Sequence, residues 1–190
     1  MSSGTPAANS LKGSLIVADP SLREATFFRS VLLVTEHSPQ HGAFGYILNR
    51  PIDRCVGDLL SEAVLPTDVR RRLAATPVYM GGPVSTEHLT FSALAWNEAD
   101  GSLQYSTHLS AQEALAHEAE GFQIRAFVGY SGWSGGQLED EFAHKAWIVH
   151  RPERFVIDPD VSDRLWKDLL RDLSPWHKLV ADEPDDLWLN

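Results

Sequence analysis

The sequence has very little of what marks a secreted or membrane-bound protein. Only one cysteine, Cys55, occurs among its 190 residues, so no disulfide can form within the chain. The opening segment MSSGTPAANSLKG lacks the apolar stretch of a secretory signal, and no apolar run approaches the roughly 18 residues of a membrane helix. We therefore expect a cytoplasmic protein without a membrane anchor. Cys55 is expected to be a small packing residue, because no activating partner can be placed beside it.

Clustered basic charge is also scarce. The net charge is −10; residues 1–95 carry 8 basic and 8 acidic side chains, whereas residues 96–190 carry 8 basic and 18 acidic ones. Nucleic-acid phosphates favour clustered lysine and arginine. The one basic cluster, Arg70, Arg71 and Arg72, spreads around a predicted helix rather than along one face. The charge pattern therefore predicts no direct binding to nucleic acid.

Motifs for common cofactors and metals are missing as well. The chain contains neither GxxxxGK[ST] nor GxGxxG. His37 and His41 are four positions apart, but Pro39 places them on a predicted loop, and Glu36 adds only a doubtful third ligand. A protein metal site needs three or four converging ligands. We therefore predict neither a metal nor a cofactor.

What the sequence does contain is an alternation of strands and helices. Its hydrophobic fraction of 43% and charged fraction of 22% are typical of a globular protein. Apolar runs bounded by turn residues predict strands at 15–18, 31–35, 43–49, 78–80, 89–96, 103–106, 124–130 and 147–150. Helices are predicted at 56–64, 66–73, 110–120, 137–145 and 158–173. The alternation predicts a single α/β or α+β domain with a mixed sheet.

The two ends of the chain differ from this pattern. Residues 1–12 are small and polar and are expected to be disordered. The domain is expected to span 13–180, and residues 181–190 read as an acidic tail containing Leu187 and Trp188. Whether the tail frays or docks onto a partner is left open by the sequence.

Two polar positions follow an apolar strand in the first half. Asn49 and Arg50 come at the end of predicted strand 43–49, and α/β proteins often place ligands beyond such strand ends. Arg50 is suited to holding a carboxylate or phosphate with two parallel hydrogen bonds. The alternative is that Asn49 shapes the turn and Arg50 pairs with an acidic surface residue.

A glycine-rich turn joins predicted strand 124–130 to predicted helix 137–145. Backbone amides at the start of a helix attract anions, although Glu139 and its acidic neighbours already complement the helix dipole. Ser134 and Gln137 have capping-box spacing and are expected to cap this helix. The candidate ligand-binding residues are Asn49, Arg50, Gly81, Gly82, Trp133, Ser134 and Gln137. These residues form one small-anion site only if the loops that contain Arg50, Gly81-Gly82 and Ser134 converge. Trp133, like Trp147, is also typical of a core residue.

A catalytic alternative exists at the same turn. Residues 132–136, GWSGG, fit the G-x-S-x-G pattern of a nucleophile elbow. Asp158 or Asp163 and then His177 follow Ser134 in the order of the hydrolase triad, and 81–82 could supply an oxyanion amide. However, His177 lies near the tail, where we do not expect packing to hold a general base. A serine hydrolase is therefore the second hypothesis.

Four sequence blocks resemble the AlgH/YqgE family of bacterial proteins. They are 13–20 (GSLIVADP) followed by FRSV at 28–31, 37–51 (HSPQHGAFGYILNRP), 78–84 (VYMGGPV) and 129–147 (GYSGWSGGQLEDEFAHKAW). The resemblance implies a mixed α/β fold whose bent sheet partly closes on itself and is surrounded by helices. The family also carries a transcriptional-regulator label, which specifies no reaction. Because the family has no agreed catalytic residue, the resemblance assigns none to this chain. Lys145 in place of a usual glycine, and Ala25-Thr26 in place of a frequent Asp-Pro, are small departures.

The sequence therefore favours a non-enzymatic binding or regulatory protein over an enzyme. We expect it to act through a protein partner or a small anionic ligand, without touching DNA directly. The serine hydrolase that would use Ser134 is the alternative.

Overall fold

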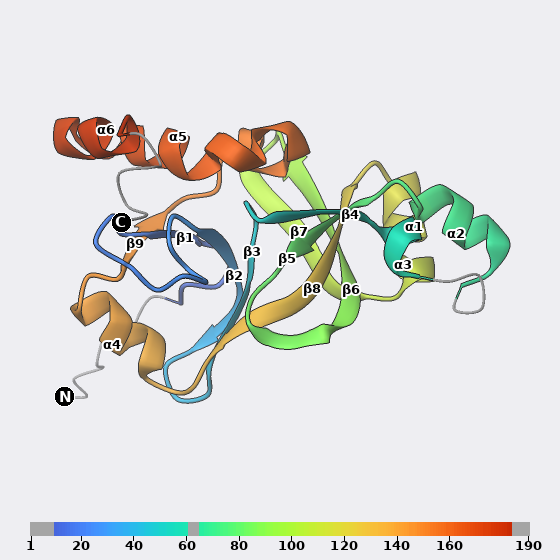
Figure 1. The fold of residues 1–190 in the computed structure, drawn as a ribbon, viewed down its shortest axis with the longest axis horizontal. Coiled ribbons are helices and arrows are strands. Elements are labelled where there is room, and N and C mark those ends of the chain that lie inside the picture. Colours follow the sequence, from blue (N-terminus) through green and yellow to red (C-terminus); the bar gives the residue numbers. More distant parts are fainter. Residues whose placement is uncertain (1–9, 61–64, 184–190) are drawn as a thin grey trace, which may run out of the picture.

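The computed structural model describes residues 10–60 and 65–183, which form one mixed, bent sheet with helices at both ends (Figure 1). The strands are β1 Leu15–Ala18, β2 Val31–Ser38, β3 Gly42–Ile47, β4 Pro51–Cys55, β5 Pro77–Met80, β6 Val84–Asn97, β7 Ser102–Leu109, β8 Gln123–Trp133 and β9 Trp147–His150. The sheet order is β4-β5-β8-β3-β2-β1-β9, with β6 pairing with both β7 and β8. The expected α/β fold with a bent, partly closed sheet is confirmed.

The helices gather in two groups (Figure 1). The first group, α1 Val56–Leu59, α2 Thr67–Leu73 and α3 Ala111–Ala119, lies at one end of the molecule. The second group lies at the other end and comprises α4 Gln137–Ala143, α5 Leu165–Arg171 and α6 Pro175–Ala181. Two 3₁₀-helices, η1 Arg154–Ile157 and η2 Pro159–Arg164, lead into α5. Each group covers its own cluster of buried side chains.

Strand β8 connects the two clusters. Its first part pairs in parallel with β5, through Val78 and Ala126, and antiparallel with β6. Its last residues pair with β3, where Trp133 lies opposite Ala43. Because one strand is hydrogen-bonded in both halves of the sheet, the two halves belong to a single domain.

The turn after β5 passes unusually close to β8. The carbonyl of Gly81 accepts the Ile47 amide at 2.9 Å and the Ser131 hydroxyl at 3.1 Å, and the Gly81 amide donates to the Val128 carbonyl at 2.9 Å. A Cβ atom at Gly81 would lie 2.4 Å from the Gly129 carbonyl oxygen, far inside van der Waals contact. Only glycine fits at this crossing without moving the backbone.

One arginine, Arg125 on β8, lies in the core with 1% of its surface exposed. Its guanidinium donates to the carbonyls of Leu48 at 3.2 Å and Val156 at 2.9 Å, and it lies 5.1 Å over the Tyr79 ring. Burial lowers the pKa of Arg125. The side chain therefore ties η1 to the end of β3 from inside the protein.

Several elements differ from the predicted boundaries. Strand β8 continues through Gly132, which the sequence placed in a turn, and β4 was missed because its polar residues resemble a loop. The predicted helix 158–173 divides into η2 and α5, and helix α6 was not anticipated. Of the predicted helix 56–64, α1 is present, and residues 61–64 lie outside the described part.

Residues flanking the predicted 13–180 domain also contact it. The Leu11 amide donates to Nδ1 of His37 at 3.1 Å, and the Leu11 side chain packs against the larger core cluster, so this residue contacts the domain. Ala181 is buried, and Asp182 pairs with Arg171 at 2.6 Å. Residues 1–9 and 184–190, which make up the rest of the predicted segment and tail, lie outside the described residues.

His37 was expected on a loop, but it lies on β2 with its side chain 3% exposed. Its Nδ1 accepts the Leu11 amide, so its Nε2 carries the proton and donates to Glu139 at 3.0 Å. This histidine therefore joins the N-terminal segment to α4.

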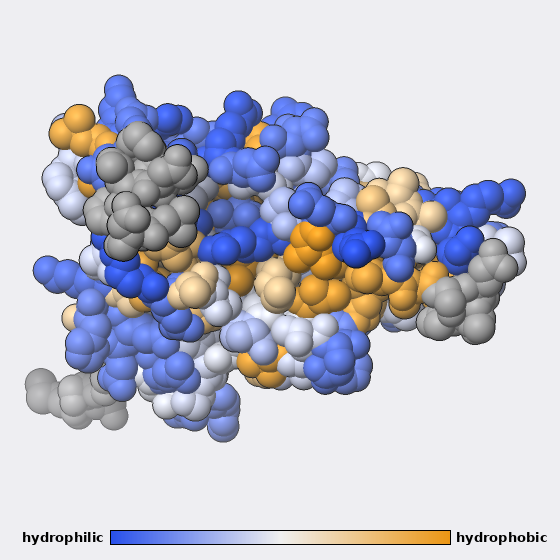
Figure 2. Space-filling view, in the orientation of Figure 1, coloured by the Kyte–Doolittle hydropathy of each residue, from blue (hydrophilic) through white to orange (hydrophobic). Residues whose placement is uncertain are grey.

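The surface of the face shown in Figure 2 is hydrophobic over the middle of the molecule, around β4, β6 and β8, and most of the rest is hydrophilic, apart from a hydrophobic group at the end where α6 lies. Leu59 and Val84 are among the exposed large apolar side chains, with 43% and 37% of their surface accessible. Across the part of the chain that is described, no helix has both the length and the apolar character to cross a bilayer.

The buried Tyr46 phenol on β3 predicts a specific response to alkaline pH. Burial raises the pKa of Tyr46 to about 12, and the nearby Tyr130 and Glu36 add to the rise. An unfolded phenol ionises near pH ~10, so the stability contribution of neutral Tyr46 is complete below that pH and is lost as pH rises toward 12. We expect Tyr46→Phe to lose less stability than the wild type over this interval. Urea unfolding at a series of alkaline pH values measures the free energy of unfolding of both proteins. If this free energy falls equally steeply with pH in the wild type and in Tyr46→Phe, the prediction is wrong.

Candidate functional site

Asn49 has both ends of its side-chain amide occupied by backbone. Its Oδ1 accepts the Val31 amide at 2.8 Å, and its Nδ2 donates to the Arg29 carbonyl at 3.0 Å. These bonds fasten the start of β2 to the residues that follow β3. Asn49 therefore shapes the turn, which is the alternative to ligand binding that the sequence suggested. Both polar atoms of its side chain already have backbone partners.

Arg50, the next residue, is half-buried, and its guanidinium donates to the Phe28 carbonyl. Burial lowers the pKa of Arg50. No carboxylate among the described residues pairs with this side chain, so the expected surface ion pair is absent there. A partly desolvated guanidinium whose partner is a neutral carbonyl retains the capacity to bind an anion.

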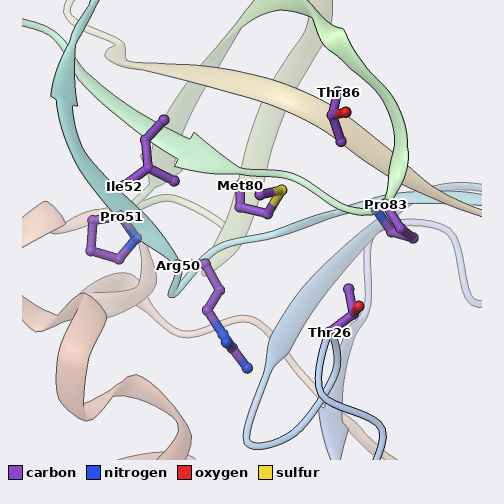
Figure 3. A pocket seen from close by; sticks show the side chains of 7 residues that line it. All are labelled: Thr26, Arg50, Pro51, Ile52, Met80, Pro83 and Thr86. Atoms are coloured by element: carbon purple, nitrogen blue, oxygen red, sulfur yellow. The ribbon is translucent and has the colours of Figure 1, made fainter.

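A cavity of about 380 Å³ lies beside Arg50 (Figure 3). Pro51, Ile52 and Met80 line one side and Pro83 and Thr86 another, and the Arg50 guanidinium extends away from Met80. Thr26 is the remaining lining residue. The walls are largely apolar, and Arg50 is the one lining residue with a charge.

Arg50 also lines a second, adjacent cavity of about 200 Å³. Arg29 and Lys167 contribute two further cations there, against one acidic residue, Asp163. The Arg29 guanidinium lies 5.0 Å over the Trp166 ring, and burial lowers the pKa of Arg29. We call the two cavities together the Arg50 cleft: one part is apolar, and the other is lined by three basic side chains and one acidic side chain.

Trp133 does not line this cleft. It is 5% exposed and lies in the core, where its indole Nε1 donates to Glu141 Oε2 at 2.9 Å. The Trp147 indole donates to the same oxygen at 2.7 Å. Gln137 donates to the other Glu141 oxygen at 3.0 Å. The prediction of Trp133 as a ligand contact is therefore not supported, and the core alternative describes it.

Ser134 and Gln137 are engaged with each other. The Ser134 amide and hydroxyl both donate to Gln137 Oε1, at 3.1 and 3.2 Å. An amide oxygen is too weakly basic to take a proton from a serine nucleophile. The two residues therefore close the turn before α4, close to the capping role that their spacing predicted.

The other members of the hydrolase alternative are committed elsewhere. His177 lies on α6, and its Nδ1 contacts the Ser174 hydroxyl at 2.8 Å. Asp158 caps η2 by accepting the Asp160 amide at 2.9 Å. Asp163 lines the Arg50 cleft. The contacts of these residues do not form a triad with Ser134.

The three predicted loops converge only in part. The Arg50 carbonyl accepts the Met80 amide at 2.8 Å, which brings the 81–82 turn beside the Arg50 cleft. Ser134 instead follows Trp133, which pairs with the start of β3, whereas Arg50 lies beyond its other end. The glycine-rich turn therefore belongs to the scaffold. Of the seven predicted site residues, Asn49 and Arg50 line the Arg50 cleft, and the 81–82 turn lies between its lining residues Met80 and Pro83.

Sequence reasoning missed most of the cleft's walls. Ile52 belongs to none of the four sequence blocks, and it lies near Met80 because β4 pairs with β5. Met80 and Pro83 belong to the 78–84 block but were not predicted to line a site. Thr26 and Thr86 arrive from still other parts of the chain. In residues 10–60 and 65–183, no three His, Cys, Asp or Glu side chains gather as a potential metal site.

Comparison with known proteins places the chain in a family. A family model described as AlgH-like matches residues 15–178. The chain belongs to the AlgH-like family. A UPF0301 protein of Streptomyces coelicolor is 35% identical over 202 residues, covering 99% of this chain and 100% of the relative. A UPF0301 protein of Chlamydia trachomatis serovar L2b is 33% identical, covering 94% of this chain and 95% of the relative.

Solved structures agree with the AlgH-like fold. The solution structure of the AlgH protein from Pseudomonas aeruginosa has a TM-score of 0.64 and 26% identity, covering 97% of this chain and 99% of that one. A crystal structure from Corynebacterium diphtheriae has a TM-score of 0.67 and 24% identity, covering 96% and 95%. The names of these proteins specify no ligand and no reaction.

The shared acceptor for two indoles predicts a strong effect at Glu141. Glu141→Ala removes the acceptor of both tryptophan N–H groups, and we expect the free energy of unfolding to fall by about 3 kcal/mol. Its neighbour Asp140 is exposed and lies in the first turn of α4, so Asp140→Ala should lose less than about 1 kcal/mol through the helix dipole. Urea unfolding followed by tryptophan fluorescence compares the two variants. Equal losses would show that the indole contacts contribute little.

Proposed function

We propose that this AlgH-like protein is a non-enzymatic binding protein whose Arg50 cleft takes a small anionic ligand with an apolar portion. The observation that carries the proposal is the position of Arg50, which lines both parts of the cleft. One side chain therefore borders an apolar space and a cationic one.

The chemistry of the walls suggests how such a ligand would lie. An apolar group would pack against Ile52, Met80 and Pro83, where the removal of apolar surface from water favours binding. A carboxylate, sulfonate or phosphate would take the end with Arg29 and Arg50, where a guanidinium can form two parallel hydrogen bonds. Partial burial of Arg50 lowers the local dielectric and strengthens that attraction. The larger part, at about 380 Å³, is within the usual size range of small-molecule sites.

On this proposal, ligand binding would regulate a contact with a protein partner in the cytoplasm. The net charge of −10 disfavours direct binding to DNA, which is why a regulatory role would be exerted through a protein. The hydrophobic surface around β4, β6 and β8 in Figure 2 is a candidate face for that partner. The regulator label of the family is compatible with this arrangement.

Substitution of Arg50 tests the proposal with a defined probe. We expect 8-anilinonaphthalene-1-sulfonate, an anion with an apolar body, to bind the wild type with saturable fluorescence enhancement. Arg50→Met keeps an apolar stem but removes the charge, so it should weaken binding by about tenfold or more. Octanoate should displace the probe, whereas octanol, which lacks the charge, should displace it much less.

Arg72→Met is the matched control. It makes the same change of charge at a residue that lines a separate cavity of about 310 Å³ and pairs with Glu118. We expect this variant to bind the probe as the wild type does. If Arg50→Met also binds normally, or if octanol competes as well as octanoate, the Arg50 cleft is not an anion site and the proposal is wrong.

A further inference from the structure

A third cavity, of about 210 Å³, lies apart from the Arg50 cleft. Strands β3, β6, β7 and β8 all contribute to it. Consecutive residues of β6 line different cavities, because Ser85 faces this one and Thr86 faces the Arg50 cleft. We call this space the Tyr46 cavity, and no sequence motif pointed to it.

Its most unusual feature is a buried phenol that contacts an exposed imidazole. The Tyr46 hydroxyl lies 3.1 Å from Nδ1 of His108, 62 positions away in the sequence, and Tyr46 is only 2% exposed. Because burial raises the pKa of Tyr46 to about 12, its hydroxyl stays protonated at neutral pH. The pair can therefore offer either a hydrogen or a lone pair to a third group, depending on which partner donates within the pair.

Aromatic rings form much of the wall. Tyr46 packs against Phe127 with ring centroids 4.8 Å apart, and Tyr130 stacks on Phe44 at 5.1 Å. These neighbours hold the two tyrosine rings in fixed orientations at the edge of the space. A cavity of roughly 150 Å³ is already large enough for benzene, so this one has room for a single aromatic ring.

The backbone around the cavity is held in uncommon conformations. Ser85 has φ of +53° and His108 has φ of +58°, both in the left-handed region that costs energy for residues with a Cβ. A third lining residue, Gly129, has φ of +67°, and a Cβ there would lie 2.5 Å from the Gly82 carbonyl oxygen. Such conformations concentrate where a protein orients groups toward a ligand.

We propose that the Tyr46 cavity binds a small neutral aromatic molecule bearing a hydroxyl or ring nitrogen. The ring would pack against Tyr46 and Tyr130 in an offset or edge-to-face arrangement. Its polar atom would bond the Tyr46–His108 pair, with the hydroxyls of Ser85 and Thr90 nearby.

The charge of the surroundings argues for a neutral ligand. Neither lysine nor arginine lines the cavity, so it offers no fixed cation to an anionic group. This selectivity is opposite to that of the Arg50 cleft, and the two sites can be tested independently.

Titration of 4-fluorophenol, followed by its ¹⁹F resonance, tests the proposal. We expect a saturable shift with the wild type and with Arg50→Met. Tyr46→Phe removes only the hydroxyl and should weaken binding about fivefold, the effect of losing one hydrogen bond. Thr90→Trp should fill the space and abolish the saturable shift. Tyr105→Phe is the matched control, because it removes another partly buried hydroxyl that bonds the Thr35 carbonyl outside the cavity.

His108→Asn provides a second route to the same answer, because asparagine also tolerates the left-handed conformation. If circular dichroism shows that Tyr46→Phe does not fold, His108→Asn takes its place as the test and should weaken binding of 4-fluorophenol. Absence of a saturable shift with the wild type overturns the proposal. Equal binding by the wild type and every folded variant of Tyr46, Thr90 and His108 overturns it as well.

Discussion

The backbone of Gly81 crosses β8 at a distance that leaves no room for a side chain. Its carbonyl accepts two hydrogen bonds, from the Ile47 amide and the Ser131 hydroxyl, while its amide donates to Val128. Three strands, β3, β5 and β8, are thereby fixed relative to one another around a single residue. A Cβ would also lie 2.8 Å from the Tyr46 ring, so the same crossing determines where that side chain sits.

Both candidate sites are arranged around this crossing. Met80 and Pro83, on either side of the 81–82 turn, form walls of the Arg50 cleft. Tyr46 and Gly129, which contact the crossing, line the Tyr46 cavity. The cleft combines apolar walls with arginine, whereas the cavity combines aromatic rings with a hydroxyl–imidazole pair. The two candidate sites therefore share one part of the backbone, the crossing at Gly81.

The sequence predicted the features that depend on neighbours along the chain. The apolar runs of β1 and β9 and the capping box of α3 are present where the residue pattern placed them, and Arg50 lies at a strand end beside a cavity. Strand β4 was missed because Asp53 and Arg54 interrupt its apolar pattern, although pairing with β5 holds it in the sheet.

Features that depend on distant contacts were beyond sequence reasoning. Trp133 could be read from the sequence as a ligand contact or as a core residue, and only the fold shows Glu141 as the acceptor for its indole. Nothing in the local sequence relates Tyr46 to His108, and Arg125 shows no partner until Leu48 and Val156 are brought to it. Residues 132–136 fit the pattern of a nucleophile elbow because glycine-rich turns have similar sequences with or without a general base beside the serine.

Equilibrium unfolding of Gly81→Ala tests most directly whether the crossing organises the protein. The added Cβ would meet the Gly129 carbonyl at 2.4 Å, and we expect the variant to lose about 3 kcal/mol or more of stability. Gly132→Ala makes the same chemical change on β8, where the new atom would meet only the Tyr130 ring at 3.3 Å, and it should lose much less. A Gly81→Ala protein as stable as Gly132→Ala would contradict the account.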